Sequence, residues 1–549
     1  MEGYDPVKST ADKVGICMRY LRAAERQSMG EISRCILLYP RIKSLMANPY
    51  KVDGNLSQDL QALRDHALDL ARLQAVEDAE AAARLEADGD SRQAARRRKN
   101  ASRLLFKLVP GNASALSAVF TPNGSIVTDP SDIAKVLRSH WEGVFQARGV
   151  NACKLRQWIE DDMASRRACG ELHSKMKDVQ LQRWHFQRAL DLSNDSSPGP
   201  DGIPYGAWRA LGDDAIDLLF EAALEMVDPD FSVHMREEYS DFHDSVLLYL
   251  TKKATGKLED GTAVYEAGNV RPLNVTNTNN RLIASAARLA IEPVLATLVS
   301  PDQRGFIGGR SMIANLIDID EAIAQFALST DDAVALFYDF ASAFPSVEHE
   351  LLHSYFRSLG WPPWLLRLAH VLYYNNSCRI SLGKMLFAGF MLTRGIRQGC
   401  PLSPLLFTVV SELFLRRLRR TVADTVNRAW ADDLAMVMKN GISRLGLLSH
   451  LFAEFSEVSG LHLHIGKTII VPLFPYDLLA IRDAVSRVAP EWAGVAIQGW
   501  AKYLGVVVGP EKGERSWNGP LAKYIHRARL WGRVGLDYIL PFAPIWYIL

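Results

Sequence analysis

Two adjacent aspartates, Asp432 and Asp433, lie between two short runs of residues with strand character. This pattern predicts a β-hairpin with the aspartate pair in its tight turn. Two like charges side by side do not stabilise a fold, whereas a bound divalent metal would neutralise their repulsion. Mg²⁺ prefers carboxylate oxygens and binds through one or two of them together with substrate phosphates. Because an isolated Asp-Asp pair is more often a solvated turn, the hypothesis of a metal site depends on a third carboxylate.

The third carboxylate lies upstream, where residues 333–338 form a short apolar run that is typical of a buried strand. This run leads directly into Asp339. An aspartate at the end of a buried strand, facing an aspartate-bearing hairpin, could hold two metal ions between the two elements. Two-metal sites polarise the attacking oxygen and stabilise the leaving oxygen in phosphoryl transfer.

The residues around these aspartates, 339–347 and 427–438, resemble motifs A and C of reverse transcriptases. Further segments are similar, in the same order, to motifs of the non-LTR (LINE-type) retrotransposon enzymes: residues 197–204 (SPGPDGIP), 269–273 (NVRPL), 302–306 (DQRGF), 395–404 (GIRQGCPLSP), 459–467 (SGLHLHIGK) and 503–505 (YLG). The resemblance extends from residue 101 to residue 509, which is most of the chain. Several motifs in the family's order support this resemblance far more strongly than any single motif does.

This resemblance implies an RNA-directed DNA polymerase of a non-LTR retroelement. In that family a primer 3′-hydroxyl attacks the α-phosphate of a dNTP and releases pyrophosphate. The implied cofactors are two Mg²⁺ ions, with Mn²⁺ as a substitute, because phosphoryl transfer depends on positioning and charge neutralisation. The implied partners are template RNA, a DNA primer or target, and dNTPs.

The resemblance also assigns roles to individual residues. It makes Asp339, Asp432 and Asp433 the metal ligands, with Asp433 the weaker one, and Lys467 a proton donor to pyrophosphate. It assigns nucleotide binding to Arg271, Arg281, Phe344, Gln398 and Gly399. In this interpretation the two arginines clamp the triphosphate, and Phe344 presses against a ribose 2′-hydroxyl. The alternatives are ordinary surface positions for Lys467 and the arginines, and a core position for Phe344.

Two residues depart from the family's pattern. Trp430 stands where the family has Tyr or Phe before the Asp pair, at a position that contacts the primer end in the nucleic acid. Pro345 replaces an acidic or amide residue, and proline lacks a backbone donor. These departures favour an alternative, a catalytically impaired retroelement-derived RNA-binding protein. An RNA-directed RNA polymerase shares the two-metal site, but Phe344 and the RQG sequence at residues 397–399 argue against it.

A basic block follows an acidic stretch near the N-terminus. Arg96, Arg97, Arg98 and Lys99 come after residues 77–90, which are rich in Asp and Glu. The block is either a solvated helix face that pairs with the acidic part, or a nucleic-acid-binding or nuclear localisation patch.

Composition adds limits to these hypotheses. The 549 residues carry a net charge of +1, so overall charge does not indicate a polyanion partner. The six cysteines are scattered without a CxxC pair, which does not support a zinc knuckle. The start lacks a signal-peptide pattern, and no apolar run reaches spanning length. We expect an intracellular protein without a membrane partner, nuclear by the resemblance or part of a cytoplasmic ribonucleoprotein.

The expected fold class is α+β, because helices and strands intermix without regular β-α alternation. The resemblance implies a right-hand polymerase architecture with fingers and palm, a helical N-terminal extension and an incomplete thumb. The expected regions are a helical, partly basic region at 1–110, an N-terminal extension of a hairpin plus helices at 111–185, fingers and palm at 186–510, and the start of a truncated thumb at 511–549. We expect no endonuclease or RNase H domain in this chain, because neither flank offers the room.

Local patterns predict two further features. The Asn123-Gly124 pair between residues 118–120 and 125–127 predicts a hairpin, and Asp129-Pro130 predicts the start of the next helix. Two histidine pairs, His349 with His353 on an expected helix and His462 with His464 on an expected strand, have spacings seen in metal sites. No third ligand is spaced near either pair, so we interpret them as surface or core histidines.

Overall fold

The computed structural model describes residues 9–25, 29–45, 58–91, 93–95, 97, 116–171, 176–229, 240–259, 262–329, 332–373, 376–383 and 385–533. Contacts divide the chain into two compact units, which are Met1–Ser114 together with Gly519–Leu549, and Ala115–Asn518. Every residue predicted to bind a nucleotide or a metal belongs to the second unit. The first unit contains the predicted basic block.

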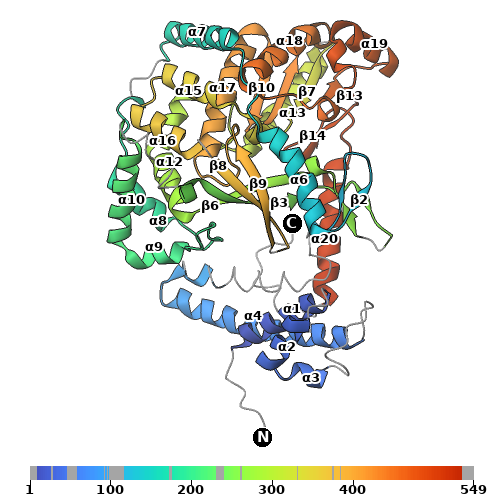
Figure 1. Ribbon diagram of the computed structural model, residues 1–549. Helices are drawn as coiled ribbons and strands as arrows, with labels where there is room; N and C mark the ends of the chain where they lie inside the picture. Colours follow the sequence, from blue (N-terminus) through green and yellow to red (C-terminus); the bar gives the residue numbers. More distant parts are fainter. Residues whose placement is uncertain are drawn as a thin grey trace. The chain divides into compact units, whose positions relative to one another are not determined.

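The N-terminal part of the first unit is helical, as the sequence predicts. Its helices are α1 (Thr10–Glu25), α2 (Met29–Leu38), α3 (Ile42–Leu45) and α4 (Gln58–Ala87), drawn in blue in Figure 1. These helices bury an apolar core of their own, which includes Tyr20, Ile32 and Leu63. The unit therefore has an independent source of stability from apolar burial.

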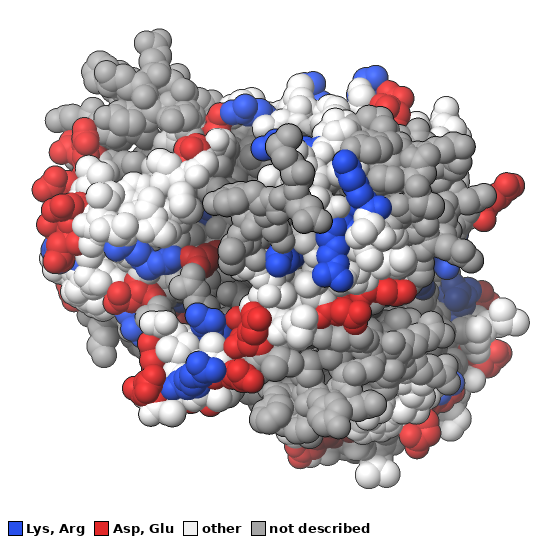
Figure 2. Space-filling model, turned by 90° about the horizontal axis from the view of Figure 1, so that it is seen from below, with Lys and Arg blue, Asp and Glu red and all other residues white. Residues whose placement is uncertain are grey.

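The basic block is only partly within the described residues. The guanidinium of Arg97 lies 3.5 Å from the carboxylate of Asp78, in the acidic stretch, which favours the solvated helix face over a phosphate site at that residue. Arg96, Arg98 and Lys99 lie outside the described residues. On the face shown in Figure 2, the described basic and acidic side chains are interspersed, in keeping with a net charge near zero.

Five described strands of the second unit form the sheet that holds the predicted aspartates. Their order is β10 (Thr425–Trp430), β11 (Asp433–Met438), β7 (Val334–Tyr338), β12 (Ile469–Pro472) and β13 (Ala496–Ile497). The central strand β7 is antiparallel to both β11 and β12. Its alternate residues face two different core clusters, so that Leu336 packs into one and Phe337 into the other. Burial on both faces explains why the sequence of β7 is apolar throughout.

A second sheet has the strand order β6 (Val270–Thr276), β3 (Asp244–Thr251), β8 (Asn376–Leu382) and β9 (Met385–Leu392). Strand β3 is antiparallel to β6 and parallel to β8. Helix α6 (Pro130–Phe145) packs on this sheet, where the ring of Phe145 lies 5.9 Å from that of Phe390. Both the mixture of helices with sheets and the irregular order of strands agree with the predicted α+β class.

The predicted hairpin and helix start are confirmed. Strands β1 (Val119–Phe120) and β2 (Ile126–Val127) pair in antiparallel register. Asp129 caps α6 by accepting hydrogen bonds from the backbone N–H groups of Ser131 and Asp132, which satisfies donors that the helix itself leaves free.

Figure 1 also draws the remaining helices and strands. They are α7 (Ala152–Ala168), α8 (Arg183–Asp191), α9 (Tyr205–Leu211), α10 (Asp213–Met226), α12 (Thr278–Leu298), α13 (Met312–Ser329), α14 (Ala343–Ser346), α15 (His349–Ser358), α16 (Pro363–Tyr373), α17 (Ser403–Thr421), α18 (Gly441–Ser459), α19 (Leu478–Val488), α20 (Arg515–Arg533), β4 (Gly256–Lys257), β5 (Ala263–Val264), β14 (Ala501–Tyr503) and β15 (Val506–Val508). Among the helices that the structure describes, none combines the length and the apolar composition that a membrane span needs.

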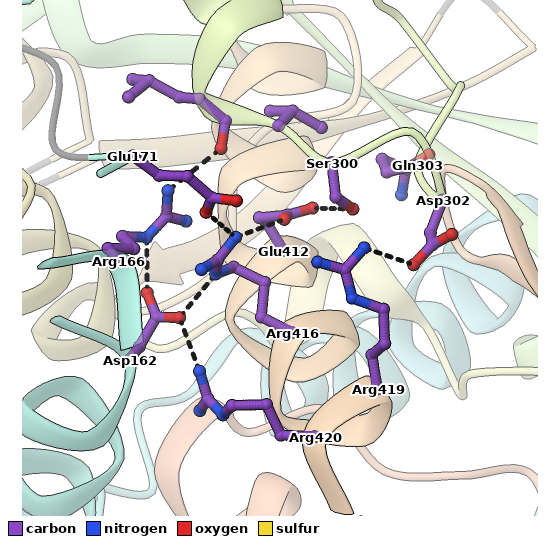
Figure 3. Close-up of polar contacts among 12 residues, drawn as sticks. Asp162, Arg166, Glu171, Ser300, Asp302, Gln303, Glu412, Arg416, Arg419 and Arg420 are labelled. Atoms are coloured by element: carbon purple, nitrogen blue, oxygen red, sulfur yellow. Dashed lines mark hydrogen bonds and ion pairs between the residues drawn. The ribbon is translucent and has the colours of Figure 1, made fainter. Parts of the chain in front are cut away.

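A buried ionic cluster joins α7 to α17 (Figure 3). The carboxylate of Asp162 has no exposed surface, and it accepts from Arg166 at 2.7 Å, Arg416 at 2.8 Å and Arg420 at 3.3 Å. Burial alone would raise the pKa of Asp162, but the arginines outweigh it and lower that pKa. The carboxylate is therefore ionised and holds two helices together through charge.

Asp162→Asn should lower the free energy of unfolding by about 3–5 kcal/mol, because the arginines would lose their counter-ion in a site with little water. Asp161 offers a matched control. Its side chain is 48% exposed and pairs with Arg417, so Asp161→Asn should cost at most ~1 kcal/mol. Chemical denaturation of the two variants measures the difference, and equal losses would contradict the role of the cluster.

Candidate active site

The β10–β11 hairpin places the two adjacent aspartates in different environments. Trp430 pairs with Asp433, so Ala431 and Asp432 form a two-residue turn. The sequence predicted both aspartates in the turn, but Asp433 is already the first residue of β11. Ala431 has φ = 58°, which is the left-handed region and is costly for a residue with a Cβ atom. Asp432 thus follows a strained residue.

The end of β7 brings Asp339 to this hairpin. Leu434 of β11 pairs with Tyr338, the last residue of β7, so Asp339 follows beside the start of β11. The backbone of Asp339 is held by the 459–467 segment, because its carbonyl accepts from the His464 N–H at 2.7 Å. The carboxylate of Asp339 lies 3.6 Å from Nζ of Lys467 in the same segment. Residues 459–467 therefore fix both the main chain and the charge of Asp339.

Repulsion between carboxylates is evident in the electrostatics. Burial raises the pKa of Asp432, and Asp339 adds to the rise, whereas Arg271 and Lys252 oppose it. The pKa of Asp433 is raised to about 6 by desolvation and by repulsion from Asp432 and Asp339. A cation bound here would relieve this repulsion.

The donor set fits a divalent cation that shares its coordination with a substrate. Asp339 and Asp432 supply carboxylate oxygens, which Mg²⁺ prefers. Among the described residues, no group of three or more His, Cys, Asp or Glu side chains is arranged to hold a metal ion by itself. That Asp339, Asp432 and Asp433 together bind metal stays a prediction. An aspartate pair completed by phosphate oxygens is the usual mode for Mg²⁺ at phosphate-transfer sites.

The predicted nucleotide residues Gln398 and Gly399 lie against strand β6. The carbonyl of Gln398 accepts from the Asn274 N–H at 2.8 Å. Gly399 has φ = 124°, and a Cβ atom there would lie 2.3 Å from the carbonyl oxygen of Asn274, so only glycine allows this approach. The side-chain oxygen of Gln398 is buried and has no hydrogen-bond partner among the described residues. It is available to a donor group on a ligand.

The two predicted triphosphate clamps have different environments. Arg271 is exposed on β6 and acts electrostatically on Asp432, as a phosphate-binding residue should. Arg281 is buried instead. Its guanidinium donates to Oγ of Ser196 at 3.1 Å and to the carbonyl of Ser197 at 2.7 Å, and it stacks over the ring of Tyr205. These contacts do not match a triphosphate clamp, and they give Arg281 the role of fixing the 196–205 segment.

Phe344 lies in an aromatic group with Phe306 and Phe407. It is half-buried in α14, and its ring stacks on Phe407 with centroids 4.7 Å apart and an interplanar angle of 10°. Phe306 meets the same ring edge-on at 6.3 Å. One face of Phe344 is thus used in packing, and both the sugar-contact and the core hypotheses remain predictions to be tested.

Sequence spacing misplaced or missed several histidines and one glutamine. His462 and His464 flank an isolated bridge between Leu463 and Phe340, so the predicted strand is wrong. His353 lies on a helix as predicted, but it bonds His370 of α16 at 3.2 Å, a partner that no local spacing reveals. Gln303 belongs to the DQRGF motif, to which the sequence assigns no contact. Its side chain bonds the backbone of Ala431, a partner 128 residues away that no local pattern reveals.

Without divalent cations, Asp433→Asn should raise the melting temperature at pH 7.5. The folded-state pKa of Asp433 is above its unfolded value, so the ionised carboxylate destabilises the fold, and wild-type stability should fall as pH rises from about 4 to about 6. The variant should lose part of this pH dependence. Asp424→Asn changes an exposed aspartate just before β10 and should leave the profile unchanged. Identical profiles for wild type and Asp433→Asn, measured by thermal unfolding in EDTA, would refute the repulsion.

Residues 251–508 match the family described as "Reverse transcriptase (RNA-dependent DNA polymerase)". The chain is 27% identical over 346 residues to the "Transposon TX1 uncharacterized 149 kDa protein" of Xenopus laevis. The aligned region is 60% of this chain and 25% of that protein. It is 24% identical over 298 residues to the "Retrovirus-related Pol polyprotein from type-2 retrotransposable element R2DM" of Drosophila melanogaster, covering 52% of this chain and 26% of that protein.

A further relative is the "Retrovirus-related Pol polyprotein from type-1 retrotransposable element R2" of Bradysia coprophila, 28% identical over 356 residues, which are 61% of this chain and 38% of that protein. The chain thus spans 25% to 38% of the length of these curated relatives. The matched range 251–508 contains Arg271, Asp339, Asp432 and Lys467.

Proposed function

We propose that this chain, whose residues 251–508 form a reverse transcriptase domain of the non-LTR retrotransposon type, is an RNA-directed DNA polymerase. The observation that supports it best is the placement of Asp339 and Asp432 at a strand end and in a tight turn, with Arg271 and Lys252 in electrostatic reach. A pair of carboxylates faced by cations suits a dNTP with its bound metal ions. The reaction is attack by a primer 3′-hydroxyl on the α-phosphate, templated by RNA.

Asp339 and Asp432 would hold the cation, and Asp433 would contribute charge from the start of β11. Bound Mg²⁺ activates a hydroxyl and neutralises phosphate charge. Arg271 and Lys252 bind the triphosphate through charge, and the pKa of Lys252 is already lowered by desolvation and by the nearby Lys467 and Arg271. An anionic ligand would relieve this crowding of cations.

Lys467 has two uses in this proposal. In the free protein its ammonium group lies beside the carboxylate of Asp339 and partly balances that charge. When a cation takes this place, the side chain, which is 54% exposed, is free to approach the pyrophosphate and give it a proton. Lys467 thus balances part of the charge of Asp339 before a cation binds, and donates a proton to the pyrophosphate afterwards.

In this proposal the two sheets belong to different parts of the polymerase. We assign the five-stranded sheet to the palm and the four-stranded sheet with β6 to the fingers. The hydrogen bond between Asn274 of β6 and Gln398 holds the loop before α17 against the fingers sheet. Trp430, at the end of β10, is placed to contact the primer end. Copying into a DNA target would require action in the nucleus.

Asp339→Asn and Asp432→Asn should each reduce primer extension on poly(rA)/oligo(dT) with Mg²⁺ to background, because each removes half of the carboxylate pair. RNA affinity should stay within about twofold, since neither group contacts the template in this proposal. Asp433→Asn should be less severe, and Asp424→Asn should retain wild-type extension. Primer extension by Asp432→Asn above background would contradict the assignment of Asp432 as a metal ligand. Wild-type protein that binds RNA and never extends a primer would support the impaired RNA-binding alternative.

Phe344→Val tests the sugar selection. If the ring excludes a 2′-hydroxyl, the variant should keep dNTP extension, and its dNTP/rNTP ratio of kcat/KM should fall by about 10–100-fold, the range that pocket shape alone can supply. If Phe344 only packs on Phe407 and Phe306, the variant should lose about 1–3 kcal/mol of stability with the ratio unchanged. The ratio and the melting temperature are measured on the same preparation.

A further inference from the structure

The side chain of Gln303 is completely buried, and all of its hydrogen-bonding positions are used. Its Nε2 donates to the carbonyl of Ala431 at 3.1 Å and to Oγ of Ser411 at 3.0 Å. Its Oε1 accepts from the N–H of Ala431 at 3.0 Å and from that of Gly305 at 2.8 Å. An amide has two donors and room for two acceptor contacts. This glutamine is therefore fully satisfied, with half of its bonds on one residue.

That residue is the strained one. Ala431 has φ = 58°, and a non-glycine residue held in this region costs on the order of 1–3 kcal/mol unless its surroundings hold it there. Gln303 holds both the N–H and the carbonyl of Ala431, which fixes the peptide groups on both sides of its Cα atom. The next residue is Asp432, so the bonded peptide sets the position of its backbone, from which the carboxylate extends.

The loop that carries Gln303 is itself firmly held. The guanidinium of Arg310 donates to four carbonyls of this region, those of Ala296, Val299, Ser300 and Gln303, at 2.5 to 3.1 Å. Figure 3 shows Ser300, Asp302 and Gln303 together above α17, where Ser300 bonds Glu412 and Asp302 faces Arg419. The glutamine thus links a rigid loop to the turn.

The backbone around Gln303 also fits closely to the hairpin. Ala429 donates its N–H to the carbonyl of Asp302 at 2.8 Å, and its carbonyl accepts from Arg304 at 2.9 Å. A Cβ atom on Gly305 would lie 2.3 Å from the nitrogen of Ala431. No side chain fits at that position, so the amide of Gln303 meets the turn without an intervening group.

We propose that Gln303 is a positioning residue for DNA synthesis, which holds Ala431 in its strained conformation and thereby sets Asp432 in the geometry that the reaction needs. The inference rests on the proposed function for its catalytic consequence. Misplacement of a reacting geometry by about 1 Å can cost about 100-fold in rate. Gln303 touches no substrate, so its loss should act on the chemical step and on cation binding, and leave template affinity unchanged.

The test compares Gln303→Met with Asn315→Ala. Methionine keeps the length of the side chain and removes all four hydrogen bonds. Asn315 is also completely buried and bonds the same strand, through the carbonyl of Ala429 at 3.0 Å, two residues before Ala431. Its loss should destabilise the protein comparably without releasing the turn. Gln303→Glu, which keeps the acceptor contacts and loses the donors, is the second variant should Gln303→Met fail to fold.

Three measurements decide the inference: the melting temperature, kcat and KM for dTTP on poly(rA)/oligo(dT), and Mn²⁺ affinity by electron paramagnetic resonance. We expect Gln303→Met to lower kcat about 100-fold and to weaken Mn²⁺ binding, with KM and RNA affinity within about threefold. Asn315→Ala should keep kcat within about threefold. Equal effects of the two variants on kcat and on Mn²⁺ affinity would overturn the inference. If the wild type does not extend a primer, the proposed function fails, and the Mn²⁺ comparison alone then decides the role of Gln303.

Discussion

The antiparallel pairing of β7 with β11 is the interaction on which the site depends. It brings Asp339 next to the turn that carries Asp432, and it does so against the repulsion between their carboxylates. Apolar burial stabilises the fold against this repulsion. Strand β7 packs on both faces, and removing each large apolar side chain from water stabilises the folded state by about 1.5–3 kcal/mol. A crowded anionic site therefore requires a fully buried strand beneath it.

A second constraint acts through the backbone. Gly399 and Gly305 are positions where a Cβ atom would strike another segment, Asn274 in one case and Ala431 in the other. Each glycine lets two chain segments approach within hydrogen-bonding distance, and the neighbouring glutamines, Gln398 and Gln303, make the bonds. The bond beside Gly399 is made by the backbone carbonyl of Gln398, whereas the bonds near Gly305 are made by the side chain of Gln303, two residues earlier.

Local pattern predicted the parts of this protein whose cause is local. The apolar run before Asp339, the hairpin around Asp432 and the Asn123-Gly124 turn all follow from periodicity and turn chemistry. The sequence could not reveal partners that lie far apart in the chain. The bonds from Gln303 to Ala431 are of this kind, and so are the serine acceptors that bury Arg281. The sequence around an arginine looks the same whether its side chain binds a ligand or a distant loop.

The two departures from the family's pattern bear differently on activity once the local structure is known. Pro345 is the third residue of the short helix α14, where the backbone N–H has no partner within the helix, so proline removes no bond there. Trp430 keeps its place in the ladder opposite Asp433, and the turn beyond it is bonded by Gln303. Neither substitution disturbs the backbone that holds the carboxylates. Any effect of these two residues on activity would therefore act through what binds against the site, and not through the placement of Asp339 and Asp432.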